Sequence, residues 1–390
     1  NSIIPARALY RGTVTDPVTG EQVQATGSDQ LRLSTFTNSY LATGDFNGLA
    51  RILTTTNGYL RAAPGIRGEV LRQGGAPENF ISANPQFRTA SLVSNHNHAN
   101  YHSMQAQVTL RPTRGLSFQT TYTWSRNLGV GGSYTDHRDR AEDYQLTRSH
   151  RSHSFTTYGS YMLPFGAKGF LLRNPGVWRH ALEGWQMSWI LSVTSGLPGS
   201  VTGTNRLWGG GQVDRVGPFD PKSGKVTWEP GADAGYYFGE DQYMKVSDPQ
   251  CDTIAPELQN ACRVRINAIA LVDGFDENGA AIPGQIIFQH AKPGTRGNFQ
   301  PNMLTGPARW TFDMAMGKEF QMTEGTKIDF RVDAQNILNH PTPSNGYYIR
   351  NARFTMLYNP NFAMNGAEDF GYIDAKGGHR TFQAKIRISF

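Results

Sequence analysis

The chain has 390 residues, of which 17% are charged, and its formal net charge at pH 7 is +6. It contains no run of about 18 apolar residues, which excludes a membrane protein built from spanning helices. Its positive charge does not indicate a nucleic-acid-binding protein, because no basic and aromatic residues cluster and residues 202–306 are more acidic than basic.

The first 96 residues show little regular pattern. Two stretches, Gln30–Leu41 and Gly48–Leu60, alternate weakly between apolar and polar residues, so each is a candidate for an additional strand. The sequence opens at Asn1 without a basic and apolar leader. We therefore expect any export signal to have been removed or to lie upstream.

Three histidines, His96, His98 and His102, share the same parity and would project from one face of an extended strand. Three imidazoles so placed can bind copper, nickel or zinc. No carboxylate at matching spacing accompanies them, and asparagines surround them. We favour a simple hydrophilic rim, so the sequence predicts no metal site, with these three residues as weak candidates.

Seven segments share a period-two alternation between apolar and polar residues, which is strict in the last of them. In one of them, Phe118, Tyr122 and Trp124 point to one face, and the odd-numbered positions Ser117, Gln119, Thr121 and Thr123 point to the other. Each segment has the length, about 10 to 14 residues, that a tilted strand needs to cross a bilayer. The predicted strands are Tyr101–Arg111, Leu116–Arg126, Ser152–Leu163, Glu183–Ser195, Arg309–Phe320, Lys327–Leu338 and His379–Phe390.

The connections between these strands alternate between short and long. In chain order they are residues 112–115, 127–151, 164–182, 196–308, 321–326 and 339–379. A membrane barrel has short turns at one end and long loops at the other, which a two-layer sandwich has no reason to adopt. Trp124, Trp185 and Trp310 stand at strand ends, where an aromatic belt would lie. The pattern predicts an all-β, antiparallel transmembrane barrel; the alternative is a secreted β-sandwich with core aromatics.

The longest connection, residues 197–307, is predicted as a large extracellular loop. It contains both cysteines, Cys251 and Cys262, eleven positions apart. In an exported protein this spacing favours one local disulfide bond. Two free thiols are the alternative, and two thiolates alone supply only half of the ligands of a zinc site.

The last strand ends with an aromatic residue that carries the terminal carboxylate. Its alternation places Phe382, Ile386, Ile388 and Phe390 on one apolar face. This ending resembles that of bacterial outer-membrane proteins. The resemblance implies that these four residues form the signal that the outer-membrane assembly machinery reads.

The direction of the strands indicates a larger barrel. If Phe390 ends in the periplasm, the seven strands alternate down and up, and residues 1–96 form an extracellular loop region with a possible additional strand. Bacterial single-chain barrels have an even number of strands, with both ends periplasmic. Seven or eight strands would close only a narrow barrel filled by its own side chains. We therefore predict that residues 97–390 are the C-terminal transmembrane portion of a larger barrel.

Several stretches, in their order along the chain, resemble the last strands of TonB-dependent receptors. They are NPQF (84–87), NYHSMQAQVTLRPTRGLSFQTTYTWSRNL (100–128), YMLPFG (161–166), LEGWQMSWILSVTSGLP (182–198), WTFDMAMGKEF (310–320) and FRVDAQNILNHP (330–341). They are most similar to the receptors with an N-terminal carboxypeptidase-regulatory-like domain, which are abundant in acidobacteria. The resemblance implies a barrel of about 22 strands, a plug domain and a TonB-contacting segment, the last two upstream of the residues given.

The function that the resemblance implies is binding of a scarce solute and its energised import across the outer membrane. The expected partners are outer-membrane lipid and lipopolysaccharide, the N-terminal barrel and plug of the same protein, TonB and a small solute that the sequence does not name. We expect neither a nucleic-acid partner nor a cofactor. The alternative is a structural or surface-interaction barrel without active transport.

The polar positions of the last two strands predict a polar inner wall of the barrel. They are Asp329, Arg331, Asp333, Gln335, Lys385 and Arg387. The alternative is that these charges pair with one another and hold the strands or a plug.

No GxSxG, HExxH, phosphate-loop or dinucleotide motif is present, so we do not expect an enzyme.

Overall fold

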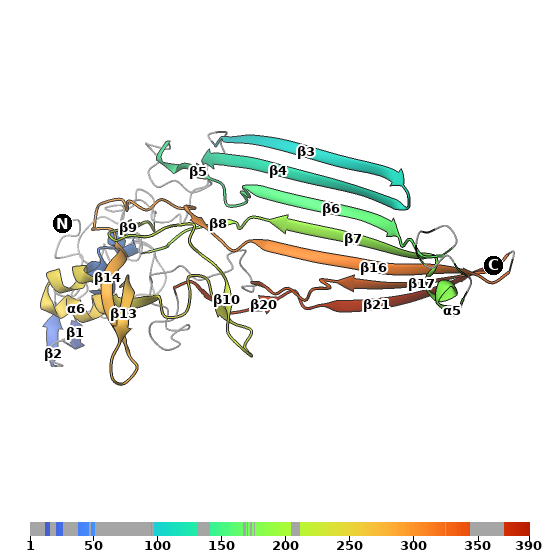
Figure 1. The fold of residues 1–390 in the computed structure, drawn as a ribbon. Coiled ribbons are helices and arrows are strands. Elements are labelled where there is room, and N and C mark those ends of the chain that lie inside the picture. Colours follow the sequence, from blue (N-terminus) through green and yellow to red (C-terminus); the bar gives the residue numbers. More distant parts are fainter. Residues whose placement is uncertain are drawn as a thin grey trace.

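In the computed structural model, antiparallel strands are the main regular element of the described residues, and they form a long sheet with a folded head at one end (Figure 1). It describes residues 12–15, 21–25, 38–46, 48–50, 95, 97–130, 141–166, 169, 171, 174, 176–203, 211–323, 325–343 and 370–390. We call the long sheet the wall. The head consists of the described residues of 197–307 together with residues 370–373.

Seven long strands form the wall, in the order β21-β17-β16-β7-β6-β4-β3, and every neighbouring pair is antiparallel. They are β3 (Ala99–Thr113), β4 (Leu116–Val130), β6 (His153–Met162), β7 (Trp185–Thr194), β16 (Arg309–Gln321), β17 (Lys327–Gln335) and β21 (Thr381–Ser389). A short strand, β5 (Tyr144–Leu146), pairs with the end of β4. The seven predicted strands are confirmed, with differences only at their ends.

The register of the wall brings the apolar positions of neighbouring strands together. Phe155 lies opposite Val193, which lies opposite Trp310. At the other edge, Phe330 lies opposite Ile386. Residues opposite each other point to the same face of a sheet. The wall therefore has one apolar face and one polar face across all seven strands.

Many side chains of the apolar face are exposed among the described residues. The exposed fraction of Val108 is 59% and that of Ile386 is 67%. Full burial of such a side chain is worth about 1.5–3 kcal/mol, and contiguous exposed apolar surface of this kind marks a site of membrane or protein contact. This face is therefore suited to hydrocarbon, and the polar face to water.

Tryptophans stand at both ends of the apolar face. Trp124 lies opposite His153, the first residue of β6, and Trp310 lies at the start of β16, so both are near the head. Trp185 begins β7 at the opposite end, where its ring meets Phe330 edge to face at 6.2 Å. Two aromatic girdles are typical of strands that cross a bilayer.

The two ends of the wall differ in their connections. Arg114 and Gly115 join β3 and β4 with positive φ angles of 49° and 83°, the conformation of the two-residue turns whose twist matches that of the strands. At this same end, which we call the turn end, β6 and β7 are connected through helix α5 (Val177–Leu182). At the other end the head connects β7 to β16. The predicted alternation of short and long connections is thus present.

The segment predicted as one large loop is a folded unit, which corrects the expectation of an irregular connection. Its strands are β8 (Pro198–Gly199), β9 (Val213–Arg215), β10 (Thr227–Trp228), β11 (Gly235–Tyr236), β12 (Tyr243–Ser247), β13 (Asn267–Phe275), β14 (Ala281–His290) and β15 (Leu304–Thr305). Most of them are too short for their alternation to be recognised, and register shifts interrupt the β13–β14 pair. The sequence pattern therefore indicated a loop.

The head has a buried aromatic core. Phe219 lies in no strand, yet its ring centroid is within 6.4 Å of the centroids of five other rings. These rings belong to Phe238, Tyr243, Phe288, Phe299 and Phe370. The last comes from beyond β17 and extends the head, as does β19 (Tyr372–Ile373), which pairs with β11. Contacts between residues so far apart in the chain cannot be recognised from the local sequence pattern.

The chain passes between the wall and the head where residues 196–199 lie against residues 304–307, a junction that we call the neck. β8 pairs with β15, and the Gly306 N–H donates to the Leu197 carbonyl at 2.9 Å. A Cβ atom at Gly196 would lie only 1.7 Å from the Gly306 oxygen. Only glycine therefore permits the two backbones to approach this closely. Outside the neck, β18 (Thr342–Pro343) pairs with β20 (Lys376–Gly377).

The described residues near the N-terminus form short elements. β1 (Gly12–Thr15) pairs with β2 (Gln22–Ala25). Residues 38–41 belong to helix α2 (Asn38–Thr43) and residues 48–50 are helical, so both candidate strands of this region are wrong where the structure describes them. The reason is tertiary packing, because α2 buries Ala42 beside the head and Leu49 is buried as well, and packing outweighs a weak local β preference. No helix in the described ranges is long and apolar enough to span a membrane.

Candidate functional site

The polar face of the wall has a neutral half and a charged half. Strands β3, β4, β6 and β7 contribute mainly Ser, Thr and Gln to this face, whereas β17 and β21 contribute Asp, Arg and Lys. The two halves therefore offer different chemistry to whatever they contact.

The charged half contains the predicted inner-wall residues. Arg331 pairs with Asp333 at 2.7 Å, and Lys327 pairs with Glu319 at 2.9 Å. The register places all six predicted residues on this one face, namely Asp329, Arg331, Asp333, Gln335, Lys385 and Arg387. The Arg331–Asp333 pair agrees with the alternative that the charges bind one another. That the group contacts a solute or a plug stays a prediction.

The neutral half contains a hollow of about 440 Å³. Its lining residues are Thr109, Leu110, Ser117, Phe118, Gln119, Tyr158, Gly159, Ser160, Ser188, Trp189 and Ile190. Leu110, Phe118 and Trp189 belong by register to the apolar face, so the polar-face residues supply the side chains that surround the hollow. None of the lining residues is charged.

Small side chains form the floor of the hollow. Ser117, Ser160 and Ser188 lie opposite one another in a row across β4, β6 and β7, and the hydroxyl oxygens of Ser117 and Ser160 are 3.1 Å apart. In the next row Tyr158 lies opposite Ile190, with exposed fractions of 47% and 53%. The two larger side chains therefore form a raised apolar edge beside a hydroxyl-lined floor.

This arrangement suits a neutral solute. Tyr158 and Ile190 offer apolar contact, and the serine hydroxyls and the Gln119 amide can donate and accept hydrogen bonds. Asp313 lies opposite Ile190, and its carboxylate accepts the Asn336 N–H at 2.7 Å. A ligand with one apolar face and several hydroxyl or amide groups would match the hollow.

Sequence reasoning did not single out Tyr158 and Ile190. Both occupy positions that Ser, Thr or Gln residues take along the same strands, on the face that is otherwise polar. An apolar residue that interrupts the polar side of an alternating segment is the signal that could have found them.

The predicted assembly residues lie together on the last strand. Phe382, Ile386 and Ile388 project from the apolar face of β21, and Phe390 follows the strand. All four are exposed, and the Arg380 guanidinium lies 5.3 Å from the centre of the Phe382 ring. Their placement on one bare edge strand is as the pattern predicts. Their role in assembly stays a prediction.

The histidines considered as weak metal candidates are separated in their contacts. His98 stacks on Tyr144, with 5.5 Å between ring centroids, and His102 lies opposite Arg126 in the β3–β4 register. His96 lies outside the described residues. Within the ranges that the structure describes, no three metal-binding side chains gather at one point.

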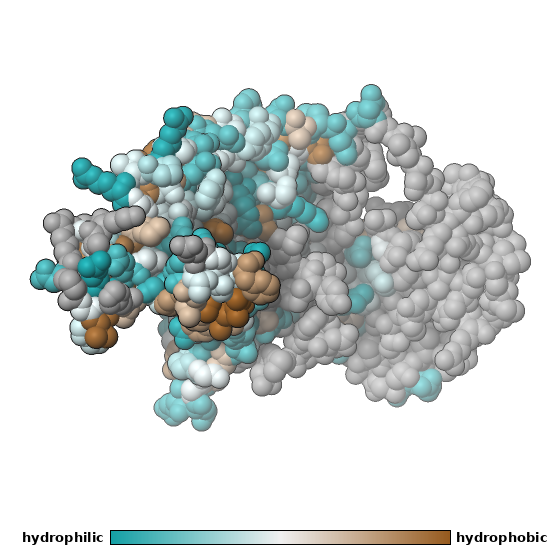
Figure 2. All heavy atoms as spheres, turned by 90° about the vertical axis from the view of Figure 1, so that its right-hand side faces the viewer, coloured by the Kyte–Doolittle hydropathy of each residue, from teal (hydrophilic) through white to brown (hydrophobic). Residues whose placement is uncertain are grey.

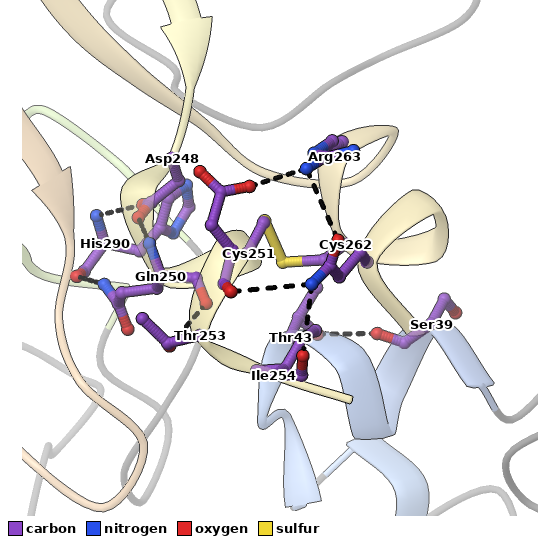
Figure 3. The surroundings of a disulfide bond; sticks show 12 residues. Ser39, Thr43, Asp248, Gln250, Cys251, Thr253, Ile254, Cys262, Arg263 and His290 are labelled. Atoms are coloured by element: carbon purple, nitrogen blue, oxygen red, sulfur yellow. Dashed lines mark hydrogen bonds and ion pairs between the residues drawn. A yellow bond between two sulfur atoms is a disulfide. The ribbon is translucent and has the colours of Figure 1, made fainter. Parts of the chain in front are cut away.

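The predicted disulfide bond between Cys251 and Cys262 is present (Figure 3). It connects the short helix η3 (Pro249–Thr253) to α6 (Pro256–Arg263) and is buried in a cluster with Ala42 of α2. Asp248 ties this cluster to the sheet of the head, because its carboxylate accepts the N–H groups of Gln250 at 3.0 Å and His290 at 2.9 Å.

Buried polar contacts join the head to the connection between β4 and β6. The Asn302 amide donates to the Leu146 carbonyl at 2.8 Å, and Arg296 pairs with Asp143 at 3.5 Å. In the same connection, the Asn127 N–H donates to Nδ1 of His150 at 3.2 Å. Burial, followed by the nearby positive charge of Arg126, lowers the pKa of His150. The neutral imidazole is the form that accepts this bond.

Comparison with known families gives one match. A family model described as an outer membrane beta barrel domain matches residues 35–383. This range contains six of the seven wall strands completely, the whole head and the start of β21. No curated protein matches the chain.

Proposed function

The chain belongs to the outer membrane β-barrel domain family, and from this premise we propose that it is the C-terminal barrel part of a TonB-dependent receptor. In this proposal the whole protein binds a scarce solute outside the cell and imports it with energy supplied through TonB. The head faces the outside, and the turn end of the wall and the C-terminus face the periplasm, because barrels of this class carry their long connections outside.

The open edges of the wall support a larger barrel. Among the described residues, β3 and β21 each pair with one neighbour in the wall and leave the other edge free. Five antiparallel strands separate them, so β3 and β21 run in the same direction. An antiparallel wall then closes only with an odd number of further strands, which gives an even total as single-chain barrels have. We propose that upstream strands of the same protein complete the wall.

The hollow at Tyr158 and Ile190 carries the proposal of solute binding. It lies on the polar face, which would be the inside of the closed barrel, and it combines apolar contact with uncharged hydrogen-bonding groups. A concave site with a few convergent polar groups is the usual form of a small-molecule site. We therefore propose that a neutral solute passes over this part of the wall.

The first test is the mass of the intact protein extracted directly from outer membranes. A mass well above the 43.1 kDa of this chain, with peptides of the chain at its C-terminal end, is the expected result. A product of 43.1 kDa that forms a closed barrel by itself would contradict the proposed larger receptor.

The second test compares two tyrosines on the polar face. Tyr158 lines the hollow, whereas Tyr101 lies outside it and is also exposed. Small molecules retained by the purified full protein are identified by mass spectrometry, and their uptake by cells is then measured. Tyr158→Ser should reduce retention and uptake several-fold, and Tyr101→Ser should leave both near the wild-type level.

A third test asks whether uptake by the same cells depends on the proton gradient, as energised import requires. Collapse of the proton gradient across the inner membrane should stop uptake of the retained compound while leaving its binding intact. Uptake that is insensitive to the gradient and to Tyr158→Ser would contradict transport by this route.

A surface-interaction role is the second candidate. It is favoured by the β13–β14 hairpin of the head, which exposes Phe275 and Ile282 beside its turn. In this case, replacement of both residues by serine should weaken attachment of the protein to a partner at the cell surface. Solute uptake should then be absent from wild-type cells as well.

A further inference from the structure

Helix α5 is exposed at the turn end of the wall, close to the C-terminus in Figure 1. The exposed fraction of Val177 is 83% and that of Trp178 is 73%. Figure 2 looks onto this end and shows apolar patches at the front among hydrophilic residues. An aliphatic residue and a tryptophan left so bare on one short helix require an explanation.

Two hydrogen bonds hold α5 against the apolar face of the wall. The Trp185 indole donates to the Ala181 carbonyl at 2.9 Å, and the Lys318 ammonium donates to the same oxygen at 3.1 Å. Trp185 and Lys318 lie opposite each other in the register of β7 and β16. Both side chains belong to the apolar face, in the row of residues nearest the turn end. The end of α5 therefore sits on the side of the wall that faces hydrocarbon, not on the side of the hollow.

The position of Lys318 supports this placement. It is the charged residue of an otherwise apolar row of β16, and it is buried. Its ammonium lies 4.9 Å from the centre of the Phe320 ring, in addition to its bond to Ala181. A bare lysine on a lipid-facing surface is unfavourable. The carbonyl at the C-terminal end of a helix stabilises such a cation, so α5 covers the charge where the wall leaves the hydrocarbon.

We propose that α5 lies in the headgroup layer of the leaflet at the turn end, with Val177 and Trp178 inserted among the lipids. The C-terminal end of the helix bonds to Trp185 and Lys318 of the apolar face, and the turn end of the wall also exposes Met322 and Phe390. Tryptophan prefers this layer because its ring is apolar and its N–H is polar. The Arg179–Glu183 ion pair of 3.1 Å supplies the polar side of the helix. The connection between β6 and β7 is thus a lipid anchor that fixes the depth of the wall.

The test uses spin labels on the full protein reconstituted in vesicles of phosphatidylethanolamine and phosphatidylglycerol. Val177→Cys and Trp178→Cys are labelled separately, since the natural cysteines of this chain are bonded to each other. The collision rates of each label with dissolved oxygen, which concentrates in hydrocarbon, and with a water-soluble nickel complex together report the depth of the label in the bilayer. Val108→Cys on the apolar face and Val216→Cys in the head are the matched exposed sites.

We expect the labels on α5 to have an oxygen-to-nickel collision ratio several-fold above that of Val216→Cys and below that of Val108→Cys. Nickel access equal to that of Val216→Cys would place α5 in water and overturn the proposal. Protection from both reagents would also overturn it, because a protein partner would then cover the helix. High nickel access at Val108→Cys as well would show that the wall itself does not meet lipid, a failure distinct from that of α5 alone.

Discussion

The wall and the head are both antiparallel β-structure, but they arrange their apolar residues in opposite ways. In the head, Ile269, Ile287 and Phe288 have no exposed surface. In the wall, side chains of the same kinds, such as Val108 and Ile386, are more than half exposed. The difference shows that one part of the chain is folded for water and the other for the hydrocarbon of a membrane. The head makes its own apolar interior, whereas the wall depends on the hydrocarbon around it.

The largest effect is expected in the core of the head. Phe288→Ala should destabilise the head by about 3–5 kcal/mol, because the ring is fully buried and its centroid is 4.9 Å from that of Phe219. Phe275→Ala, at the exposed end of β13, is the matched control and should cost less than about 1 kcal/mol. Urea unfolding followed by near-ultraviolet circular dichroism measures both. Equal losses would mean that Phe288 is not in a packed core.

The next largest effect distinguishes the two faces of the wall. Val108→Arg places a charge on the apolar face and should cost about 2–4 kcal/mol in a bilayer. Gln107→Arg places the same charge on the polar face one residue away and should change stability by at most about 0.5 kcal/mol. Unfolding of the wall from lipid vesicles provides the comparison. A penalty that is the same on both faces would contradict the assignment of the apolar face to lipid.

Removal of the disulfide bond should affect the head alone. Cys251→Ala with Cys262→Ala should cost the head about 2–3 kcal/mol, as expected for a cross-link that closes a loop of this size. The wall contains no part of this bond, so its resistance to unfolding in detergent should be unchanged. Loss of wall stability in the double variant would show that the two regions fold as one cooperative unit.

A smaller effect, a dependence of local stability on pH, is expected from His150 in the β4–β6 connection, which contacts the head. The folded pKa of His150 lies below the ordinary value of 6.5, so this connection has its full stability above about pH 6.5 and loses it as the pH falls through the lowered folded pKa. Amide hydrogen exchange at Asn127, corrected for intrinsic rates, should show easier opening at pH 5 than at pH 7. His150→Gln should remove this difference, and a difference that persists in the variant would have another source.

The sequence predicted the wall better than the head for a physical reason. A strand that crosses a bilayer is long and has two different faces, so alternation identified all seven from Tyr101 to Phe390. The head consists of strands of a few residues around Phe219 and Phe370, whose contact joins distant parts of the chain. The disulfide bond could be predicted from the spacing of Cys251 and Cys262 together with the expectation that the protein is exported. The two candidate strands upstream failed because both are helical where the structure describes them, and α2, within the first, packs beside the head.

The candidate site was predicted only in part. The charges of β17 and β21 were visible as alternating residues. The hollow needed the register, because Ser117, Ser160 and Ser188 come together only when β4, β6 and β7 are paired. Its signal in the sequence, Tyr158 and Ile190 at polar positions, has meaning only once the neighbouring strands are known.

The most direct measurement is a cysteine scan of residues 309–314 in β16, made one position at a time in outer membranes. Even-numbered positions belong to the apolar face and odd-numbered positions to the polar face. We expect a period of two, in which odd positions react with a water-soluble maleimide and even positions react only with a lipid-dissolved reagent. Even positions that react with neither reagent would be buried in a protein interior, and this result would contradict a wall that meets hydrocarbon.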